Sequence, residues 1–163
     1  MIKLLLIEDD LADQLIFKRI LSKCEIFHEL TCTSTISDAV EIINHTKFDL
    51  IFCDYNLPDG IALNILEQNN LLELQPIVVI TSQGDVRMAT ESLKLGAFDF
   101  ITKDNITTPG LERILQNALR AKEDKNLRTE LEQKLQENFA NTKAILENTQ
   151  DGIINKHVPP PGI

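Results

Sequence analysis

The sequence lacks tryptophan and has a single tyrosine, so aromatic residues make up only 5% of its 163 residues. Hydrophobic residues still reach 43% of the chain, which suffices for a core built from aliphatic side chains. A chain of this length fits one domain of ordinary size with additional sequence beyond it.

Long hydrophobic runs are absent as well. The apolar segment at residues 1–7 is too short for a signal peptide or a membrane span, and acidic residues follow it directly. The three cysteines, Cys24, Cys32 and Cys53, show no CxxC pair and no metal-site spacing with histidine. Their odd number and apolar neighbours are typical of reduced thiols. We therefore expect a cytoplasmic protein without a membrane segment.

Clusters of lysine and arginine are also missing, and the formal net charge is −9. The phosphate backbone of a nucleic acid repels a chain with this charge. The sequence therefore argues against nucleic acid as a direct partner, and solubility accounts for the acidity.

Hydrophobic periodicity predicts alternating strands and helices over the first three quarters of the chain. The expected strands are residues 4–7, 28–33, 50–53, 77–80 and 98–102, and the expected helices are residues 11–21, 37–44, 61–67 and 85–95. Ser37 and Asp85 are placed to cap two of these helices. Continuous apolar strands are typical of a parallel sheet buried on both faces. The pattern predicts an α/β fold with three layers.

Polar residues that can carry chemistry stand where these apolar runs end: Glu8, Asp9, Asp54, Thr81 and Lys103. In open parallel sheets, ligands bind outside the carboxyl ends of the strands. We therefore expect the fold to bring these five residues together, although they are far apart in the sequence.

Three carboxylates in one crevice repel one another, and a bound divalent cation offsets that cost. Hard oxygen ligands suit Mg²⁺ or Mn²⁺. Asp54 then has the role of a carboxylate nucleophile in aspartyl-phosphate formation. The metal, the Lys103 ammonium and the Thr81 hydroxyl are suitable partners for phosphoryl oxygens. A lone aspartate at a strand end is more often a turn residue, so the prediction depends on all five groups.

Four motifs extend this pattern: LLLIEDD at 4–10, IFCDYNLPDG at 51–60, IVVITS at 77–82 and GAFDFITK at 96–103. In this order and spacing, residues 1 to about 122 resemble the receiver domain of two-component response regulators. The resemblance implies a doubly wound, five-stranded parallel sheet in the flavodoxin-like order 2-1-3-4-5. It also implies a phosphoprotein of signal transduction.

The resemblance assigns Asp54 as the phosphorylated aspartate and Glu8 and Asp9 as the acidic pair. It favours Asp9 as the direct metal ligand and gives Asn56 a metal-binding backbone carbonyl. Asp10 competes with Glu8 for a place in the pair, and the register of the apolar run favours Glu8.

The resemblance also assigns Thr81 as the switch hydroxyl, Lys103 as the phosphate-binding lysine and Phe100 as the aromatic switch residue. The family often has proline after this lysine, with a cis peptide bond between them. Here Asp104 follows, and a non-proline cis bond costs roughly 2.5–4 kcal/mol. This departure favours a trans bond.

A long polar helix is predicted from Leu111 to about Asn148. Its apolar seam predicts a short coiled coil with a stutter and a homodimer, and the seam residues are Leu127, Leu131, Leu135, Phe139, Leu146 and Ile153. The alternative is a solvated extension of the last helix of the fold. Residues 144–154 resemble the start of a PAS sensor domain, with a frayed helix end as the alternative.

The expected organisation is therefore a receiver domain at 1–122, a helical linker at 123–150 and a truncated PAS-like start or disordered tail at 151–163. The chain would then be a fragment of a longer signalling protein.

The sequence leaves three functions open. The first is a receiver in a phosphorelay that takes its phosphoryl group from a histidine kinase or phosphotransfer protein. Its only reactions would be Mg²⁺-dependent self-phosphorylation and slow autodephosphorylation. The second is a metal-dependent phosphohydrolase, a class that usually carries aspartate where Asn56 stands. The third is a receiver-like interaction module that is never phosphorylated, and the complete set of strand-end residues argues against it.

Overall fold

The computed structural model describes residues 1–68, 75–82, 85–154 and 162, and it describes side chains as far as residue 148. The chain divides into two units, Met1–Arg120 and Ala121–Ile163.

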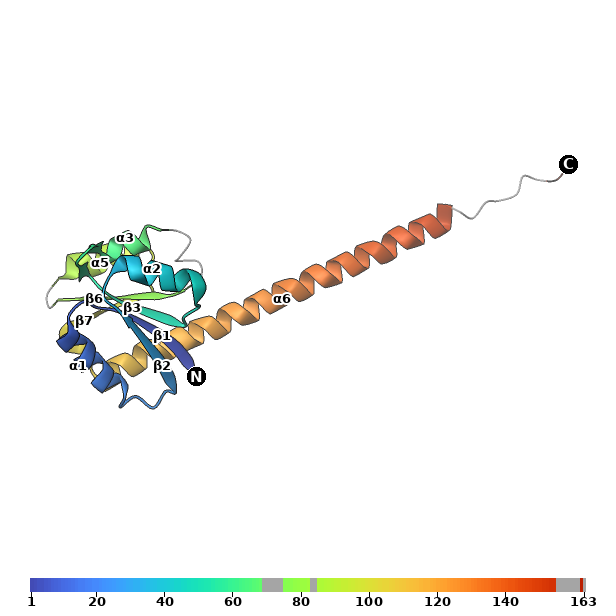
Figure 1. The fold of residues 1–163 in the computed structure, drawn as a ribbon. Helices are drawn as coiled ribbons and strands as arrows, with labels where there is room; N and C mark the ends of the chain where they lie inside the picture. Colours follow the sequence, from blue (N-terminus) through green and yellow to red (C-terminus); the bar gives the residue numbers. More distant parts are fainter. Residues whose placement is uncertain (69–74, 83–84, 155–161, 163) are drawn as a thin grey trace. The chain divides into compact units, whose positions relative to one another are not determined.

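Strands and helices alternate along the first unit (Figure 1). The elements are, in chain order, β1 (Ile2–Ile7), α1 (Leu11–Leu21), β2 (His28–Thr33), α2 (Ile36–His45), β3 (Leu50–Asp54), β4 (Asn56–Leu57), β5 (Gly60–Ile61), α3 (Ala62–Leu66), β6 (Ile77–Thr81), α5 (Val86–Lys94), β7 (Asp99–Thr102), the 3₁₀-helix η1 (Lys103–Asn105) and α6 (Thr108–Ile154). All predicted strands and helices are present close to their expected bounds. The small antiparallel hairpin β4–β5 was not predicted from the sequence.

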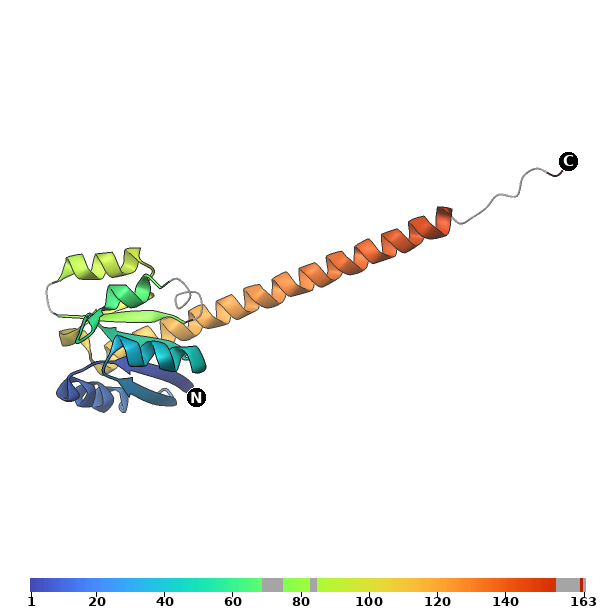
Figure 2. The same cartoon turned by 45° about the horizontal axis from the view of Figure 1, so that its top comes forward.

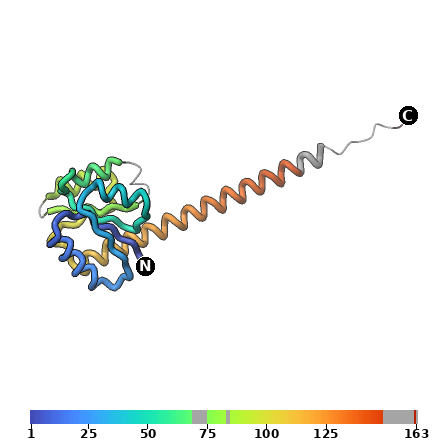
Figure 3. The backbone as a smooth tube through the Cα atoms, viewed as in Figure 1, coloured from blue at the N-terminus to red at the C-terminus, as the bar shows by residue number. Residues whose placement is uncertain are grey.

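The main sheet has five strands in the order β2-β1-β3-β6-β7, and every pair of neighbours is parallel. Because β6 and β7 are the fourth and fifth strands of this sheet, the arrangement confirms the flavodoxin-like order 2-1-3-4-5. In Figure 3 the backbone begins at the N-terminus with β1, drawn in blue. This strand lies between β2 and β3.

Two apolar clusters fill the space on the two faces of the sheet. Alternate strand residues such as Leu5 and Ile51 pack with α2, α3 and α5 on one face. Their neighbours Leu6 and Phe52 pack with α1 and the first turns of α6 on the other. Figure 2, turned from the view of Figure 1, shows the same layers with the sheet between them. The three-layer fold is therefore confirmed, and its aliphatic strands are buried on both faces.

The cap of α2 differs from the prediction. Thr35, and not Ser37, is the N-cap, and its hydroxyl accepts a hydrogen bond from the Asp38 N–H at 3.1 Å. The carboxylate of Asp59 accepts two further bonds, from the backbone N–H groups of Ile36 and Ser37, each 2.9 Å long. A carboxylate from a distant turn thus satisfies helix N–H groups that would otherwise lack partners.

The second unit consists of the continuation of α6 as far as Ile154, with Gly162 as its one described residue beyond. Every residue from 121 to 148 is exposed. The exposed side chains include the large apolar residues Leu127, Leu131, Leu135, Phe139, Ile145 and Leu146. The side chain of Ile153, the last expected seam residue, lies outside the described residues, as does most of the expected segment 151–163.

Among the helices in the described part of the chain, none is both long and apolar enough to cross a membrane.

Candidate functional site

The register of the parallel strands brings the predicted site residues to one edge of the sheet. Ile7 pairs with Cys53, so Glu8 and Asp54 follow at the same level on the adjacent strands β1 and β3. Thr81 ends β6 and pairs with Thr102, the last residue of β7. Lys103 follows at once in η1. The strand-end prediction therefore agrees with the register.

Carboxylate oxygens of Glu8, Asp9 and Asp54 all lie within 4.8 Å of one another. Glu8 and Asp54 are buried and Asp9 is exposed. Asp10 does not join this group, because its carboxylate caps α1 by accepting hydrogen bonds from the N–H groups of Ala12 and Asp13. The structure thus groups Glu8 with Asp9, as the register of the apolar run favoured.

Burial raises the pKa of two of the three acids. Desolvation raises the pKa of Glu8 to about 7, and the negative charge of Asp54 adds to this although the Asp10 N–H opposes it. Burial also raises the pKa of Asp54, while the charge of Lys103 works against the rise. Both carboxyl groups therefore bind protons more readily than free carboxyl groups do. A nearby cation would relieve this cost of their ionised forms.

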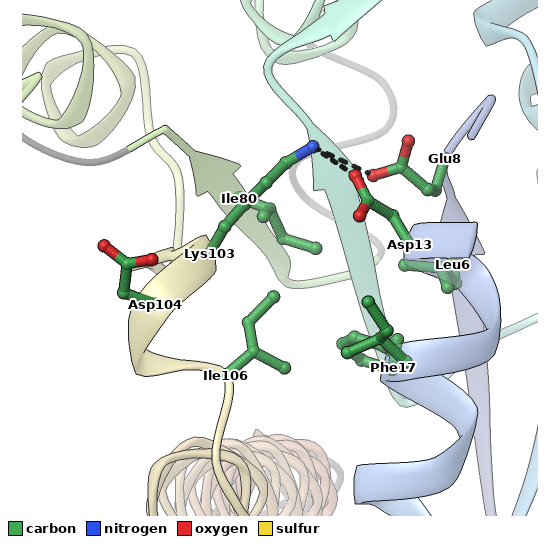
Figure 4. A pocket seen from close by; sticks show the side chains of 9 residues that line it. Leu6, Glu8, Asp13, Phe17, Ile80, Lys103, Asp104 and Ile106 are labelled. Carbon is green, nitrogen blue, oxygen red and sulfur yellow. Dashed lines mark hydrogen bonds and ion pairs between the residues drawn. The ribbon is translucent and has the colours of Figure 1, made fainter. Parts of the chain in front are cut away.

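Lys103 supplies the only side-chain cation within ion-pair distance of these acids in the described part of the chain. Its Nζ lies 3.7 Å from Glu8 Oε2 and 3.7 Å from Asp54 Oδ2. Its shortest contact is a hydrogen bond of 2.7 Å to Asp13 Oδ2 (Figure 4). Burial opposes charging of Lys103, but Asp13, Asp54 and Glu8 together raise its pKa. Lys103 is therefore an ammonium held among acids.

Asp13 was missed from the sequence. An acidic residue in the first turn of a helix is ordinarily explained by the helix dipole, so Asp13 carried no distinct signal. Only the approach of α1 to η1 shows that its carboxylate meets Lys103, ninety positions later in the chain.

The Thr81 side chain is fully buried, and its hydroxyl has no hydrogen-bond partner among the described residues. Phe100 is half-buried and lines an open groove on β7 and α6, together with Thr102 and Arg113. Asn56 is exposed and begins β4 two residues beyond Asp54. The structure thus places Phe100 in the lining of this groove.

The peptide bond between Lys103 and Asp104 is trans, since the described residues include no cis bond. Beside Lys103 lies a pocket of about 190 Å³ between α1 and η1. Its lining is apolar at Leu6, Phe17, Ile80 and Ile106, and the charged residues Glu8, Asp13, Lys103 and Asp104 stand around it (Figure 4).

Together these groups can hold a hard divalent cation and bind an anion next to it. Oxygen ligands at this spacing suit such a cation, and the ammonium and the free hydroxyl can donate to an anion.

Comparison with known proteins points to one family. The sequence profile of the response regulator receiver domain matches residues 4–116. The response regulator protein PilR of Pseudomonas aeruginosa is 35% identical over 86 residues, which cover 52% of this chain and 19% of PilR. The chain spans about a fifth of the length of the first curated relatives that it matches.

Solved structures show the same fold. A response regulator receiver domain protein from Clostridium thermocellum superposes with a TM-score of 0.67 at 22% identity, covering 76% of this chain and 98% of that one. The Mn²⁺-bound form of response regulator Rcp1 superposes with a TM-score of 0.58 at 24% identity, covering 71% of this chain and 90% of that one. At these identities the likeness concerns the fold.

Proposed function

The chain belongs to the response regulator receiver domain family, and from that premise we propose that Asp54 is the residue that takes the phosphoryl group in two-component signalling. The donor would be the phosphohistidine of a partner histidine kinase or phosphotransfer protein. The observation that carries this proposal is the position of the Asp54 carboxylate. It ends the central strand, within 4.8 Å of two other acids and 3.7 Å from an ammonium.

Mg²⁺ or Mn²⁺ is the proposed cofactor, held by the carboxylates of Glu8, Asp9 and Asp54 and the backbone carbonyl of Asn56. The fit rests on the three carboxylates within 4.8 Å and on the burial that raises the pKa of two of them. The Mn²⁺-bound form of Rcp1 has the same fold. When bound, the cation supplies positive charge for the oxygens of the transferred group.

The protein's own side chains carry out the phosphoryl transfer and the response to it. The Asp54 carboxylate attacks phosphorus, and the bond from phosphorus to the donor nitrogen breaks, leaving the donor imidazole neutral once it holds a proton. Lys103 and Thr81 then donate to the phosphoryl oxygens, and these charge-assisted bonds are stronger than neutral ones. Movement of the Thr81 hydroxyl toward the phosphoryl group leaves space that Phe100 can enter, and the surface around β7 and α6 changes.

The long helix is the proposed output. We infer that α6 pairs with α6 of a second copy through Leu135, Phe139 and Leu146, all of which are exposed in the single chain. The division into a receiver at 1–122, a linker at 123–150 and a PAS-like start or tail at 151–163 stays a prediction.

A cytoplasmic location is proposed from the cysteines. Cys24, Cys32 and Cys53 are all free thiols, which is the usual state in a reducing compartment. The proposed reactions are limited to self-phosphorylation and autodephosphorylation. Asn56 stands where a phosphohydrolase usually has an acid, so the hydrolase alternative is not favoured.

The test is labelling by a small phosphodonor. The full chain with Mg²⁺ and acetyl phosphate should gain one acid-labile phosphoryl group, measured by intact-protein mass spectrometry. Asp54→Asn should gain none, and chelation of the metal should also prevent labelling. Asp38→Asn, at an exposed acid on α2, is the matched control and should label like the wild type. Equal labelling of Asp54→Asn would remove Asp54 from its proposed role.

A further inference from the structure

The Lys103 ammonium makes one hydrogen bond to a side chain in the described structure, and its acceptor is not the proposed phosphoacceptor. The 2.7 Å contact to Asp13 has hydrogen-bond length, whereas the 3.7 Å contacts to Glu8 and Asp54 are those of ion pairs. In this state, Lys103 is therefore bound to Asp13 and only close to Asp54.

Asp13 stands apart from the acids that could hold a cation. The group of mutually close carboxylates contains Glu8, Asp9 and Asp54, and Asp13 lies one turn further, in the first turn of α1. Its backbone N–H is fixed by the Asp10 carboxylate at 3.0 Å. Its carboxylate contacts Lys103 of η1 (Figure 4).

A phosphoryl group on Asp54 would bring new anionic oxygens close to Lys103, whose Nζ lies 3.7 Å from Asp54 Oδ2 while it is bound to Asp13. Formation of the new bond requires the ammonium to turn from one acceptor toward another. Asp13 also adds a negative charge at a short distance from an incoming anion, which disfavours that anion.

The inference rests on the proposed function and adds a role for one further residue, Asp13. We propose that Asp13 is a positioning residue that competes with the phosphoryl group for Lys103 and so favours the unphosphorylated receiver. The carboxylate holds the ammonium while Asp54 is unmodified and gives it up, in whole or in part, when the phosphoryl group arrives.

The surroundings leave room for this exchange. The Lys103 side chain extends from η1 past a pocket of about 190 Å³ toward Asp13 and Glu8 (Figure 4). Its side chain is 34% exposed and that of Asp13 is 37% exposed. Movement of the ammonium therefore displaces no tightly packed neighbour.

The experiment measures binding of beryllofluoride, a phosphoryl mimic, to the full chain with saturating Mg²⁺, using fluorine NMR. Asp13→Asn should bind it about two- to fivefold more tightly than the wild type, a range typical of partly exposed ion pairs. Asp13→Glu keeps the carboxylate and should stay close to wild type. Asp104→Asn is the matched control, because Asp104 lies beside Lys103 but points away from Asp13 (Figure 4).

A second measurement examines the contact without any phosphoryl mimic. The NMR signal of the Lys103 side chain should shift in unmodified Asp13→Asn and stay unchanged in Asp104→Asn. Thermal unfolding shows that each variant is folded before binding is compared.

Equal beryllofluoride affinity in Asp13→Asn and wild type would overturn the inference, and so would an unshifted Lys103 signal. An equal gain in Asp104→Asn would also overturn it, since the effect would then be general charge. If the wild type binds no beryllofluoride in the presence of Mg²⁺, the proposed function itself fails, and this inference fails with it.

Discussion

Gln14 donates a hydrogen bond from its side-chain amide to the backbone carbonyl oxygen of Glu8, with nitrogen and oxygen 2.6 Å apart. Both residues are buried. This bond fixes α1 against the end of β1, and a second bond, from the Asp10 N–H to the Glu8 carboxylate at 3.0 Å, closes the turn between them. The backbone that carries Asp9 is therefore held between two anchored neighbours.

The two neighbouring acids should contribute unequally to metal binding. Asp9→Ala should weaken Mg²⁺ binding by at least about tenfold, because it removes an exposed carboxylate that is free to ligate. Glu8→Ala should have a smaller effect, since one Glu8 oxygen is already engaged by the Asp10 N–H and this acid can act through water. Calorimetric titration with Mg²⁺ measures both affinities. An unchanged affinity in Asp9→Ala would refute the ligand assignment.

Glu8 should make the metal-free protein less stable as the pH rises. Its pKa in the folded chain is about 7 against a reference value of 4.5, so folding favours its protonated form. The stabilisation is complete below pH 4.5 and is lost as the pH rises to about 7. Urea unfolding with a chelator should show Glu8→Gln to be more stable than wild type at pH 7.5, by on the order of 2 kcal/mol.

The comparison needs an exposed acid as its control. Glu29→Gln, on the exposed side of β2, should follow the wild type at every pH. Saturating Mg²⁺ should reduce the difference between Glu8→Gln and wild type. A constant difference between pH 4 and pH 8 in metal-free protein would contradict the prediction.

Replacement of Thr81 by valine should stabilise the unphosphorylated protein by about 1 kcal/mol, because it removes a buried hydroxyl without a described partner. The same change should weaken beryllofluoride binding, since a donor to the phosphoryl group is lost. Thr33 is a matched control, because its hydroxyl is also buried without a described partner, at the end of β2. Thr33→Val should show the gain in stability with no change in binding.

The phosphoryl group on Asp54 should turn over slowly. Asn56 and Gln83 stand two residues after Asp54 and Thr81, at positions that border the phosphoryl group in the family, and Gln83 lies outside the described residues. Both are amides, which can orient a water molecule but cannot remove its proton. Loss of label after removal of the donor should take much longer than seconds. Asn56→Asp, which adds a base, should shorten the lifetime.

The exposed helix predicts self-association of the full chain. Sedimentation should show a dimer for residues 1–163 and a monomer for a version cut after Lys122. The double variant Leu135→Ala, Phe139→Ala should weaken the dimer, because it removes apolar side chains that only a partner could bury. A monomeric full chain at high micromolar concentration would exclude the coiled coil and leave the receiver untouched.

Three of the strands, at residues 4–7, 50–53 and 77–80, could be predicted because they are continuous apolar runs. Residues 50–53 and 77–80 lie at the centre of a parallel sheet and are buried on both faces, so their sequence needs no alternation. Three strand-end residues followed from the same fact, since Glu8, Asp54 and Thr81 are each the first polar residue after such a run.

The contacts made by polar side chains across long stretches of sequence could not be predicted. Asp59 caps α2 from a turn that comes after β3 and β4, and Asp13 meets Lys103 from the opposite end of the domain. The local sequence already explains each aspartate, Asp59 as a turn residue and Asp13 as an acid at the start of a helix. Only the packing of distant elements decides which additional partner each one finds.

The uniform exposure of residues 121–148 has a thermodynamic consequence. A helix without a core depends on its own propensity, and isolated helices are only marginally stable in water. Dimerisation would then stabilise the ordered helix, and the dimer fraction rises with protein concentration by mass action. We therefore expect amide hydrogen exchange along these residues to slow as the protein is concentrated. Exchange in β1 and β3 should not respond. The length of ordered helix would thereby depend on the local concentration of the protein, so the same segment would respond to the crowding of receiver molecules as well as to their phosphorylation.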